Sequence, residues 1–345
     1  MNQLDAHIEA LNQSWIENAA ARQLTLTKPP GSLGRLEEIG NRLVAIQQTV
    51  TPDTGRKRIY VVAADHGVTA EGVSAYPREV TAQMVENFLA GGAAINVLGR
   101  LGQIDIKVVD AGVATDLAVR PGLIVVKRLR GTANFAHGPA MTRDETERLV
   151  TAGIDLARTD GIQLLGIGEM GIGNTTAASA ITAALTREDP AQHTDRGTGV
   201  DDRVLDHKIE VIRRSLSVNQ PNPDDAIDVL AKVGGAEIAV MTGLVIGAAI
   251  NRIAVIADGF ISTAAAALAV TLCPTAREYL FLAHRSVERG HAALIRLIGL
   301  EPLLDLKLRL GEGTGAALAM HIVDASARLL SEMATFGEAQ VSNKD

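Results

Sequence analysis

The chain has 345 residues, of which 47% are hydrophobic, 21% are charged and 3% are aromatic, and its formal net charge is −7. This length can bury a large core, as one large domain or as two unequal ones. Acidic and basic residues are interspersed and aromatic residues are scarce, which argues against a nucleic-acid partner, because such a surface needs clustered positive charge or base-stacking side chains.

The single cysteine, Cys273, excludes an intrachain disulfide and a zinc site built from cysteines. The first fifteen residues lack a basic segment followed by an apolar one, which is the pattern of a signal peptide. The uncharged run 238–251 is too short to span a bilayer, and the alanine-rich run 259–276 indicates a buried helix. We therefore expect a cytoplasmic protein with no membrane partner.

Apolar residues recur at helical spacing in the first two dozen residues and again over 33–46, with Pro29-Pro30-Gly31 between them. We expect two amphipathic helices there, followed by a turn at 52–55. Another helix is predicted over 314–333. These terminal helical regions are expected to pack together as a small helical subdomain beside the rest of the chain.

Between the terminal regions, short continuous apolar runs indicate strands that are covered on both faces. The predicted strands span residues 59–64, 104–109, 124–126, 162–167, 253–257 and, less clearly, 279–282. Helical patterns lie between most of them. One covers 78–101, and another covers 142–158 and starts with Thr142-Arg143-Asp144-Glu145, a capping-box pattern.

Strands that alternate with helices indicate right-handed crossovers and therefore an α/β fold built on a parallel sheet. Ligands of such sheets bind outside the carboxyl ends of the strands. Three polar or glycine-rich loops follow predicted strands, at 65–67, 166–173 and 258–259. A binding site is expected among these loops.

Two glycine-rich loops each carry one glutamate. Glu169 lies within 166–173, and Glu312 lies within 311–315, just before the last predicted helix. Glycines let a backbone approach a ligand closely, and a helix that opens from such a loop offers free N–H groups to an anion. A carboxylate repels an anion, so both glutamates are candidates for a base or a hydrogen-bond acceptor.

The surroundings of each glutamate leave an alternative open. The loop at 166–171 satisfies the dinucleotide fingerprint G-x-G-x-x-G, with Glu188 or Asp189 about twenty positions on, but Glu169 would occupy the place of the pyrophosphate. For Glu312, the leucines of 306–310 supply apolar walls that raise a carboxyl pKa. The alternative is a flexible hinge with an exposed glutamate.

Two further features have both a functional and a structural interpretation. Asp65-His66 would form half of a metal site, but the other histidines lack ligand spacing, so hydrogen bonding within the loop is the alternative. The glycines at 197 and 199 precede a helix that carries Lys208. N–H groups and one ammonium can hold a phosphate together, whereas Lys208 alone fits a solvated helix face.

Nine segments, taken in order, resemble a single family. They are 29–34, 64–68, 79–84, 87–96, 168–176, 220–223, 233–235, 258–260 and 308–313. The family is nicotinate-nucleotide:dimethylbenzimidazole phosphoribosyltransferase, which takes part in assembly of the cobalamin lower ligand. The resemblance covers nearly the whole chain, without a large insertion or deletion.

The resemblance implies that nicotinate mononucleotide and 5,6-dimethylbenzimidazole give α-ribazole 5′-phosphate and nicotinate, with no cofactor and no metal. It implies a homodimer and a Rossmann-like parallel sheet flanked by helices. It also implies a small helical domain of residues 1–50 with about 316–345, and a large catalytic domain of about 51–315. Two alternatives stay open: an NAD-dependent oxidoreductase, and a non-catalytic binder of benzimidazoles or nucleotides.

The same resemblance implies roles for individual residues. The pyridinium leaving group departs neutral without an acid, but the benzimidazole must lose a proton, so one base is required. That base maps onto Glu312, and Glu169 maps close to the reacting ribose, in a direct displacement. The benzimidazole pocket maps onto Tyr76, Gln83, Met170 and Leu310. The nucleotide and phosphate contacts map onto Gly171, Gly197, Thr198, Lys208 and Ser286. Ala75 stands where some members have serine.

Overall fold

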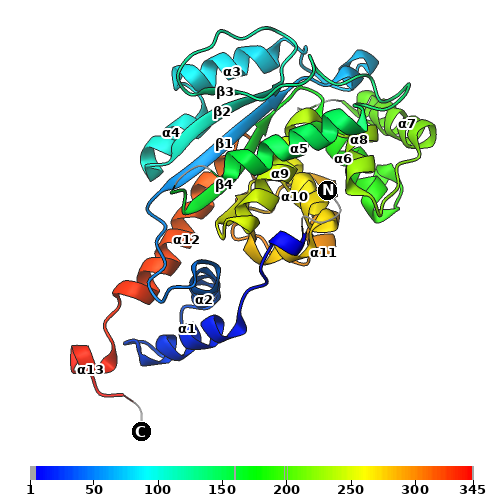
Figure 1. Cartoon of the computed structure of the whole chain (residues 1–345). Coiled ribbons are helices and arrows are strands. Elements are labelled where there is room, and N and C mark those ends of the chain that lie inside the picture. Colours follow the sequence, from blue (N-terminus) through cyan, green and yellow to red (C-terminus); the bar gives the residue numbers. More distant parts are fainter. Residues whose placement is uncertain (1–4, 159–160, 198, 200, 344–345) are drawn as a thin grey trace.

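The computed structural model describes residues 5–158, 161–197, 199 and 201–343 (Figure 1). Within these residues, six parallel strands form one sheet in the order β3-β2-β1-β4-β5-β6. The strands are β1 (Lys57–Ala64), β2 (Asp105–Gly112), β3 (Leu123–Val125), β4 (Leu164–Met170), β5 (Ala254–Ala257) and β6 (Leu280–Leu282). The predicted α/β fold with a parallel sheet is confirmed, and each strand overlaps an apolar run.

The strand order reverses between β1 and β4, so the chain leaves these two neighbours in opposite directions across the sheet. Val61 of β1 lies opposite Val108 of β2 on one side and Gly168 of β4 on the other. Parallel sheets of this kind bind ligands at the carboxyl ends of the strands near the reversal. Glu169, opposite Val62, lies at that edge.

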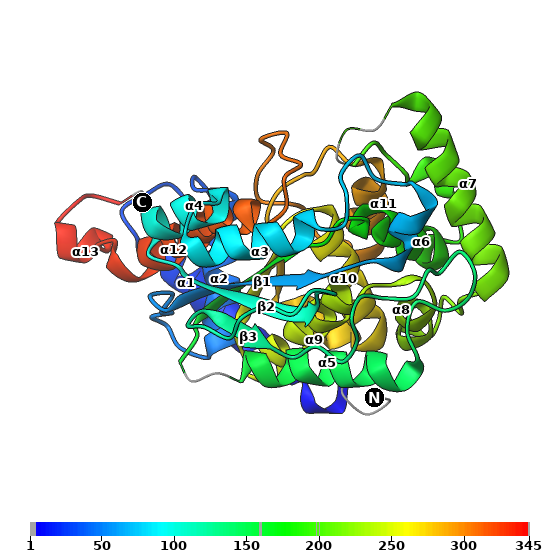
Figure 2. The same ribbon diagram turned by 90° about the horizontal axis from the view of Figure 1, so that it is seen from above.

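Helices cover both faces of the sheet (Figure 1 and Figure 2). One face carries α3 (Val80–Ala90), α4 (Ala94–Gly102) and α12 (Thr314–Glu332). The other face carries α9 (Ala236–Ile250), with α5 (Arg143–Ala157) and α10 (Phe260–Leu272) packed against it. The remaining helices are α1 (Gln13–Thr25), α2 (Arg35–Gln47), α6 (Asn174–Thr186), α7 (Asp202–Asn219), α8 (Ala226–Val233), α11 (Arg289–Ile298) and α13 (Phe336–Ala339).

Local signals explain where several helices begin and end. Thr142 caps α5, because its hydroxyl accepts from the Glu145 N–H at 3.2 Å while the Glu145 carboxylate accepts from the Thr142 N–H at 2.8 Å, as the sequence predicted. The single helix predicted over 78–101 is wrong. Gly91, at φ 81°, ends α3, and α4 begins at Ala94, although the apolar period continues across the break.

The amino-terminal helix is shorter than its apolar pattern indicates. A 3₁₀ turn covers Asp5–His7, and α1 begins only at Gln13, where the Asn12 side chain accepts from the Ser14 N–H at 2.9 Å. Both chain ends pack together, as expected: α2 contacts α12, and Leu26 forms a β-bridge with Thr335. Because α12 also packs against the sheet, the division into 1–50 with 316–345 and 51–315 stays a prediction.

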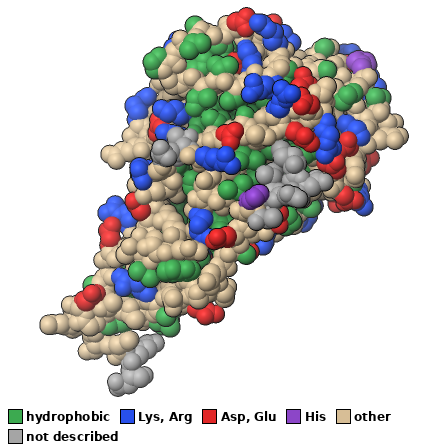
Figure 3. Space-filling model, viewed as in Figure 1, with side chains coloured by type: hydrophobic (Ala, Val, Ile, Leu, Met, Phe, Trp, Pro, Cys, Tyr) green, Lys and Arg blue, Asp and Glu red, His purple; other side chains and the backbone are tan. Residues whose placement is uncertain are grey.

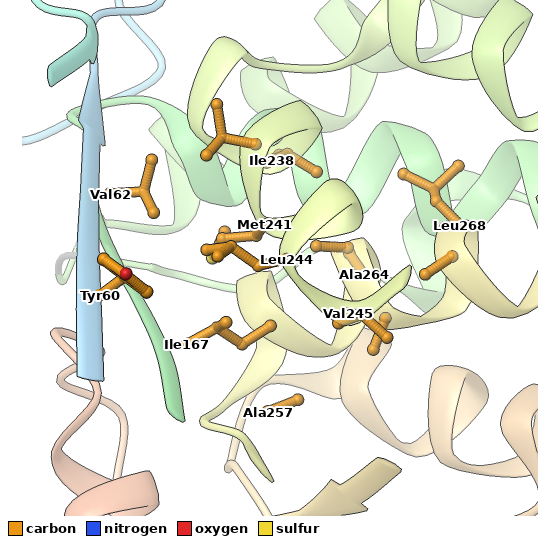
Figure 4. Close-up of a cluster of buried hydrophobic side chains, with 14 of the residues drawn as sticks. Tyr60, Val62, Ile167, Ile238, Met241, Leu244, Val245, Ala257, Ala264 and Leu268 are labelled. Atoms are coloured by element: carbon orange, nitrogen blue, oxygen red, sulfur yellow. The ribbon is translucent and has the colours of Figure 1, made fainter. Parts of the chain in front are cut away.

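The hydrophobic core extends over both faces of the sheet, and one large part of it lies between the sheet and α9. Every residue of α9 from 236 to 249 is buried, so this mostly apolar helix is covered on all sides and has no solvated face. In Figure 4, Met241 and Leu244 of α9 lie between Tyr60 of β1 and the side chains of α10. No helix within the described residues is both long and apolar enough to cross a membrane. Basic and acidic side chains are intermixed over the visible face in Figure 3.

The packing of α5 against α9 depends on glycine. A Cβ on Gly243 would collide with the Val150 carbonyl, and one on Gly153 would collide with the Val240 carbonyl. We predict that Gly243→Ala lowers the free energy of unfolding by roughly 1–3 kcal/mol, because the helices must separate. Urea unfolding measures this loss. Gly138→Ala is the control, since a Cβ there would meet nothing within 4 Å. Equal stability of the two variants would contradict the prediction.

Candidate active site

A cavity of about 530 Å³ opens at the carboxyl ends of β4, β5 and β6. This volume falls in the range of small-molecule sites. Its walls come from the loops that follow these strands and from the segment before α12. The lining residues are Tyr76, Glu169, Met170, Gly171, Ile172, Asn174, Thr175, Gly197, Gly259, Phe260, Ile261, His284, Ser286, Glu288, Lys307, Leu308, Arg309, Leu310 and Gly311.

Glu169 lies at the end of β4 and is almost fully buried, with 6% of its surface exposed. Burial, together with the charges of Glu237 and Asp258, raises its pKa to about 8, although the Asn174 side-chain amide donates to its carboxylate. A Cβ on Gly311 would collide with the Glu169 carboxylate. The two glycine-rich loops therefore touch, and their glutamates belong to one site.

Glu312 is also 6% exposed, which rules out the alternative of an exposed hinge residue. Its Oε2 has no hydrogen-bond partner among the described residues. Burial raises its pKa, a hydrogen bond with the Ile95 backbone opposes the shift, and the charge of Asp258 adds to it. Glu312 does not itself line the cavity, whose wall ends at Gly311. It is thus a buried base candidate directly behind that wall.

Lys208 lies on α7 and is 1% exposed, so its interpretation as a solvated helix residue is wrong. Its Nζ donates to the Thr175 hydroxyl at 2.9 Å and to the Asp195 carbonyl at 3.2 Å. Burial lowers its pKa to about 8, although the charges of Glu288 and Asp195 oppose this. A Cβ on Gly197 would lie 3.4 Å from the ammonium, so a buried cation stands against a cavity-lining glycine.

Three of the other four residues expected to contact the nucleotide line the same cavity. Gly171, Gly197 and Ser286 line the cavity, and the Ser286 backbone N–H donates to His291 Nδ1 at 2.9 Å. Thr198 lies outside the described residues. The same cavity is lined by Thr175, whose hydroxyl accepts from the Lys208 ammonium.

Of the four residues expected to contact the benzimidazole, three line the cavity and one does not. Met170, Tyr76 and Leu310 line the cavity, and the last two are more than half exposed, at 54% and 58%. Gln83 is exposed on α3 and is not among the lining residues. The cavity therefore has apolar walls beside its buried acids, and the individual binding roles stay predictions.

His66 makes a contact that local sequence does not predict. Its Nε2 lies 2.7 Å from Glu237 Oε1 of α9, and both side chains are fully buried. Among the described residues, no group of three or more histidine, cysteine or acidic side chains could hold a metal ion. The His66 side chain thus connects the loop after β1 to α9, while the His66 carbonyl accepts from the Thr69 hydroxyl at 2.7 Å within the loop.

The pKa of Glu169 leads to a pH-dependent prediction. Its value is raised from 4.5 to about 8, so between these values the folded protein holds a proton that the unfolded chain releases. The contribution of Glu169 to the free energy of unfolding therefore falls as pH rises through this window. Glu169→Gln, which has no charge to bury, should melt roughly 2–4 °C above the wild type at about pH 8.5.

Melting curves at two pH values test this expectation. The gain should shrink at about pH 5, because this pH lies near the lower end of the window from 4.5 to about 8 over which the wild type loses stability. Glu17→Gln, on the exposed surface of α1, should leave the melting temperature unchanged at both pH values. A Glu169→Gln variant that gains the same stability at both pH values would contradict the raised pKa.

Comparison with known proteins identifies the class. Residues 8–341 match the family model described as Phosphoribosyltransferase. The chain, with its parallel sheet and its cavity at the strand ends, is therefore an enzyme of the pentosyltransferase class.

Relatives narrow the class further. A protein of Geobacter metallireducens is 56% identical over 339 residues, which are 97% of this chain and 96% of that one. A protein of Chloroflexus aggregans is 53% identical over 341 residues, 98% of this chain and 97% of that one. Both are named nicotinate-nucleotide–dimethylbenzimidazole phosphoribosyltransferase. This chain belongs to that family.

Two solved structures from Thermus thermophilus support the assignment. One, described as this phosphoribosyltransferase, has a TM-score of 0.91 at 46% identity and covers 97% of this chain and 100% of its own. The other, described as CobT, has a TM-score of 0.92 at 47% identity and covers 96% of this chain and 100% of its own. Family membership speaks against the alternative of an NAD-dependent oxidoreductase.

Proposed function

We propose that this enzyme transfers the phosphoribosyl group of nicotinate mononucleotide to 5,6-dimethylbenzimidazole, giving α-ribazole 5′-phosphate and nicotinate for the cobalamin lower ligand. Family membership along the whole chain supports the reaction. The observation that carries the proposal in this molecule is the pair of buried glutamates, Glu169 and Glu312, on touching glycine-rich loops at one cavity.

The proposed mechanism is a direct displacement. A benzimidazole nitrogen attacks the anomeric carbon while the bond to the pyridinium nitrogen breaks, and that electron pair stays on the ring nitrogen of nicotinate, which becomes neutral. Glu312 removes the proton from the other benzimidazole nitrogen. Its raised pKa suits this role, because a base acts best when its pKa lies closer to the working pH. Attack on the face opposite the leaving group converts the β-nucleotide into an α-product.

Glu169 is assigned to ribose contact and to stabilisation of the positive charge that develops at the anomeric carbon. A pKa of about 8 keeps this carboxyl protonated near neutral pH in the free enzyme. A cationic pyridinium nucleotide bound nearby would lower that pKa and favour the ionised form. In the free enzyme, the neutral carboxyl would not repel the anionic substrate. Once the substrate is bound, the ionised carboxylate would face the reacting carbon.

The remaining residues are assigned to the phosphate or to the benzimidazole. Phosphate contacts are assigned to a buried cation, a hydroxyl and glycine-rich backbone: Gly171, Gly197, Thr198, Lys208 and Ser286. The benzimidazole is assigned to the apolar part of the cavity and its surroundings: Tyr76, Gln83, Met170 and Leu310. We also infer a homodimer in the cytoplasm, and light scattering in solution tests the dimer.

A turnover assay with a panel of acceptors tests the reaction. Purified enzyme is incubated with nicotinate mononucleotide and 5,6-dimethylbenzimidazole, benzimidazole, adenine or phenol, and both products are separated by chromatography. Equal amounts of nicotinate and α-ribazole 5′-phosphate, formed without NAD, are expected. Binding of both substrates without product would instead support a non-catalytic binder. An absorbance change that requires NAD would support an oxidoreductase.

A further inference from the structure

We propose that Asp258 is a positioning residue that holds the loop of the proposed base, Glu312. Asp258 directly follows β5 and does not line the cavity. It is 1% exposed, so its carboxylate acts on the protein itself and not on bound substrate. Because this inference rests on the proposed function, its test must separate failure of the inference from failure of the function.

The carboxylate of Asp258 supplies the cap that α12 lacks. The N-cap residue of α12 is Gly313, which has no side chain to accept from the first free N–H groups of the helix. Asp258 Oδ2 accepts from the Gly313 N–H at 3.1 Å, and Oδ1 accepts from the Ala316 N–H at 3.0 Å. A residue at the end of a strand thus fixes the start of a helix 55 positions further along the chain.

The loop held in this way is strained where it carries Glu312. Glu312 has φ 63°, between Gly311 at φ 85° and Gly313 at φ 89°. Residues with a side chain adopt this left-handed conformation uncommonly, because it costs energy relative to the usual backbone conformations. Gly168 of β4 leaves room for the loop, since a Cβ there would collide with the backbone of Glu312 and Gly313. Asp258 holds the N–H next to the strained residue.

The charge of Asp258 acts on the base as well. It is the acidic neighbour that raises the pKa of Glu312, beyond the effect of burial. The other titratable groups around the loop are Glu169 on β4, Glu237 on α9 with its partner His66, and His284 after β6, whose Nε2 lies 3.8 Å from Asp258 Oδ1. Removal of the Asp258 charge should therefore lower the pKa of Glu312.

The test measures kcat against pH for Asp258→Asn and Asp258→Ser. Both remove the charge, and serine keeps a hydroxyl that can cap a helix. We expect kcat to fall about 10- to 100-fold, because small displacements of a catalytic group slow the reaction strongly. KM for nicotinate mononucleotide should change less than about threefold. The acidic limb of the kcat profile should move to lower pH, a shift that a purely structural role would not produce.

Asp110→Asn is the matched control. Asp110 is also buried near the end of a strand, and its Oδ1 accepts from the Val113 N–H at 2.8 Å, but it does not line the cavity. It should keep the wild-type kcat profile. Absence of turnover by the wild type would mean that the proposed function fails. An active wild type whose Asp258 variants keep both kcat and the acidic limb would overturn the inference. Failure of both variants to fold would overturn it too, since Asp258 would then serve the whole fold.

Discussion

Glu312→Gln is expected to lower kcat about 10²- to 10⁴-fold, which is the usual contribution of a general base. Glutamine has nearly the shape of glutamate but cannot take the benzimidazole proton. Affinity for nicotinate mononucleotide should hardly change, because the proposed nucleotide contacts do not include Glu312. Steady-state turnover measures the first effect, and calorimetric titration with the nucleotide measures the second.

An acceptor that is methylated on nitrogen tests whether Glu312→Gln loses activity because it cannot remove the proton. The compound 1,5,6-trimethylbenzimidazole has no N–H proton to lose, so wild type and Glu312→Gln should use it at similar rates. Glu301→Gln is the control variant, since its side chain is 71% exposed. A large loss of kcat with both acceptors would show that Glu312 supports the structure of the site. Near-normal turnover with 5,6-dimethylbenzimidazole would remove Glu312 from the role of base.

The fold could be predicted from sequence because its signals are local. Runs such as 59–64 are continuously apolar, and strands covered on both faces require this pattern. The break at Gly91 was missed because apolar residues keep their helical period across it. The late start of α1 depends on the cap at Asn12, a signal that a long amphipathic pattern hides.

Residues of the candidate site could be predicted only where one short segment of the sequence contains both the reactive side chain and its characteristic neighbours. Glu169 and Glu312 stand out because each is an acid inside a cluster of glycines. In the sequence, Asp258 stands out only as part of a polar loop after a strand, because its bond to Gly313 joins segments 55 residues apart. The pair of His66 and Glu237 is separated by 171 residues. No periodicity or motif encodes such contacts, so they became visible only with the fold.

The burial of Lys208 could not be predicted from the sequence either, because the sequence of α7 is compatible with a solvated position for this residue. The ammonium is nevertheless held by Thr175 and by the Asp195 carbonyl, at 2.9 and 3.2 Å. No carboxylate among the described residues forms an ion pair with this ammonium, although the charges of Glu288 and Asp195 act on it from further away. This arrangement supports its assignment to the phosphate of the nucleotide.

Lys208→Met is expected to lower kcat/KM for nicotinate mononucleotide roughly 10- to 150-fold, the cost of about 1.5–3 kcal/mol for a lost hydrogen bond to a charged group. Methionine is an unbranched side chain only one atom shorter than lysine, and it buries no charge. Nicotinate riboside, which lacks the phosphate, should be used equally well by both enzymes, because two partners of one interaction give non-additive losses. For the wild type, KM for the nucleotide should rise above about pH 8, where the ammonium loses its proton.

Lys232→Met is the matched control, since Lys232 on α8 also donates to two acceptors, the Asp228 carboxylate and the Gln220 carbonyl, away from the cavity. Equal losses for nucleotide and riboside would contradict phosphate binding by Lys208.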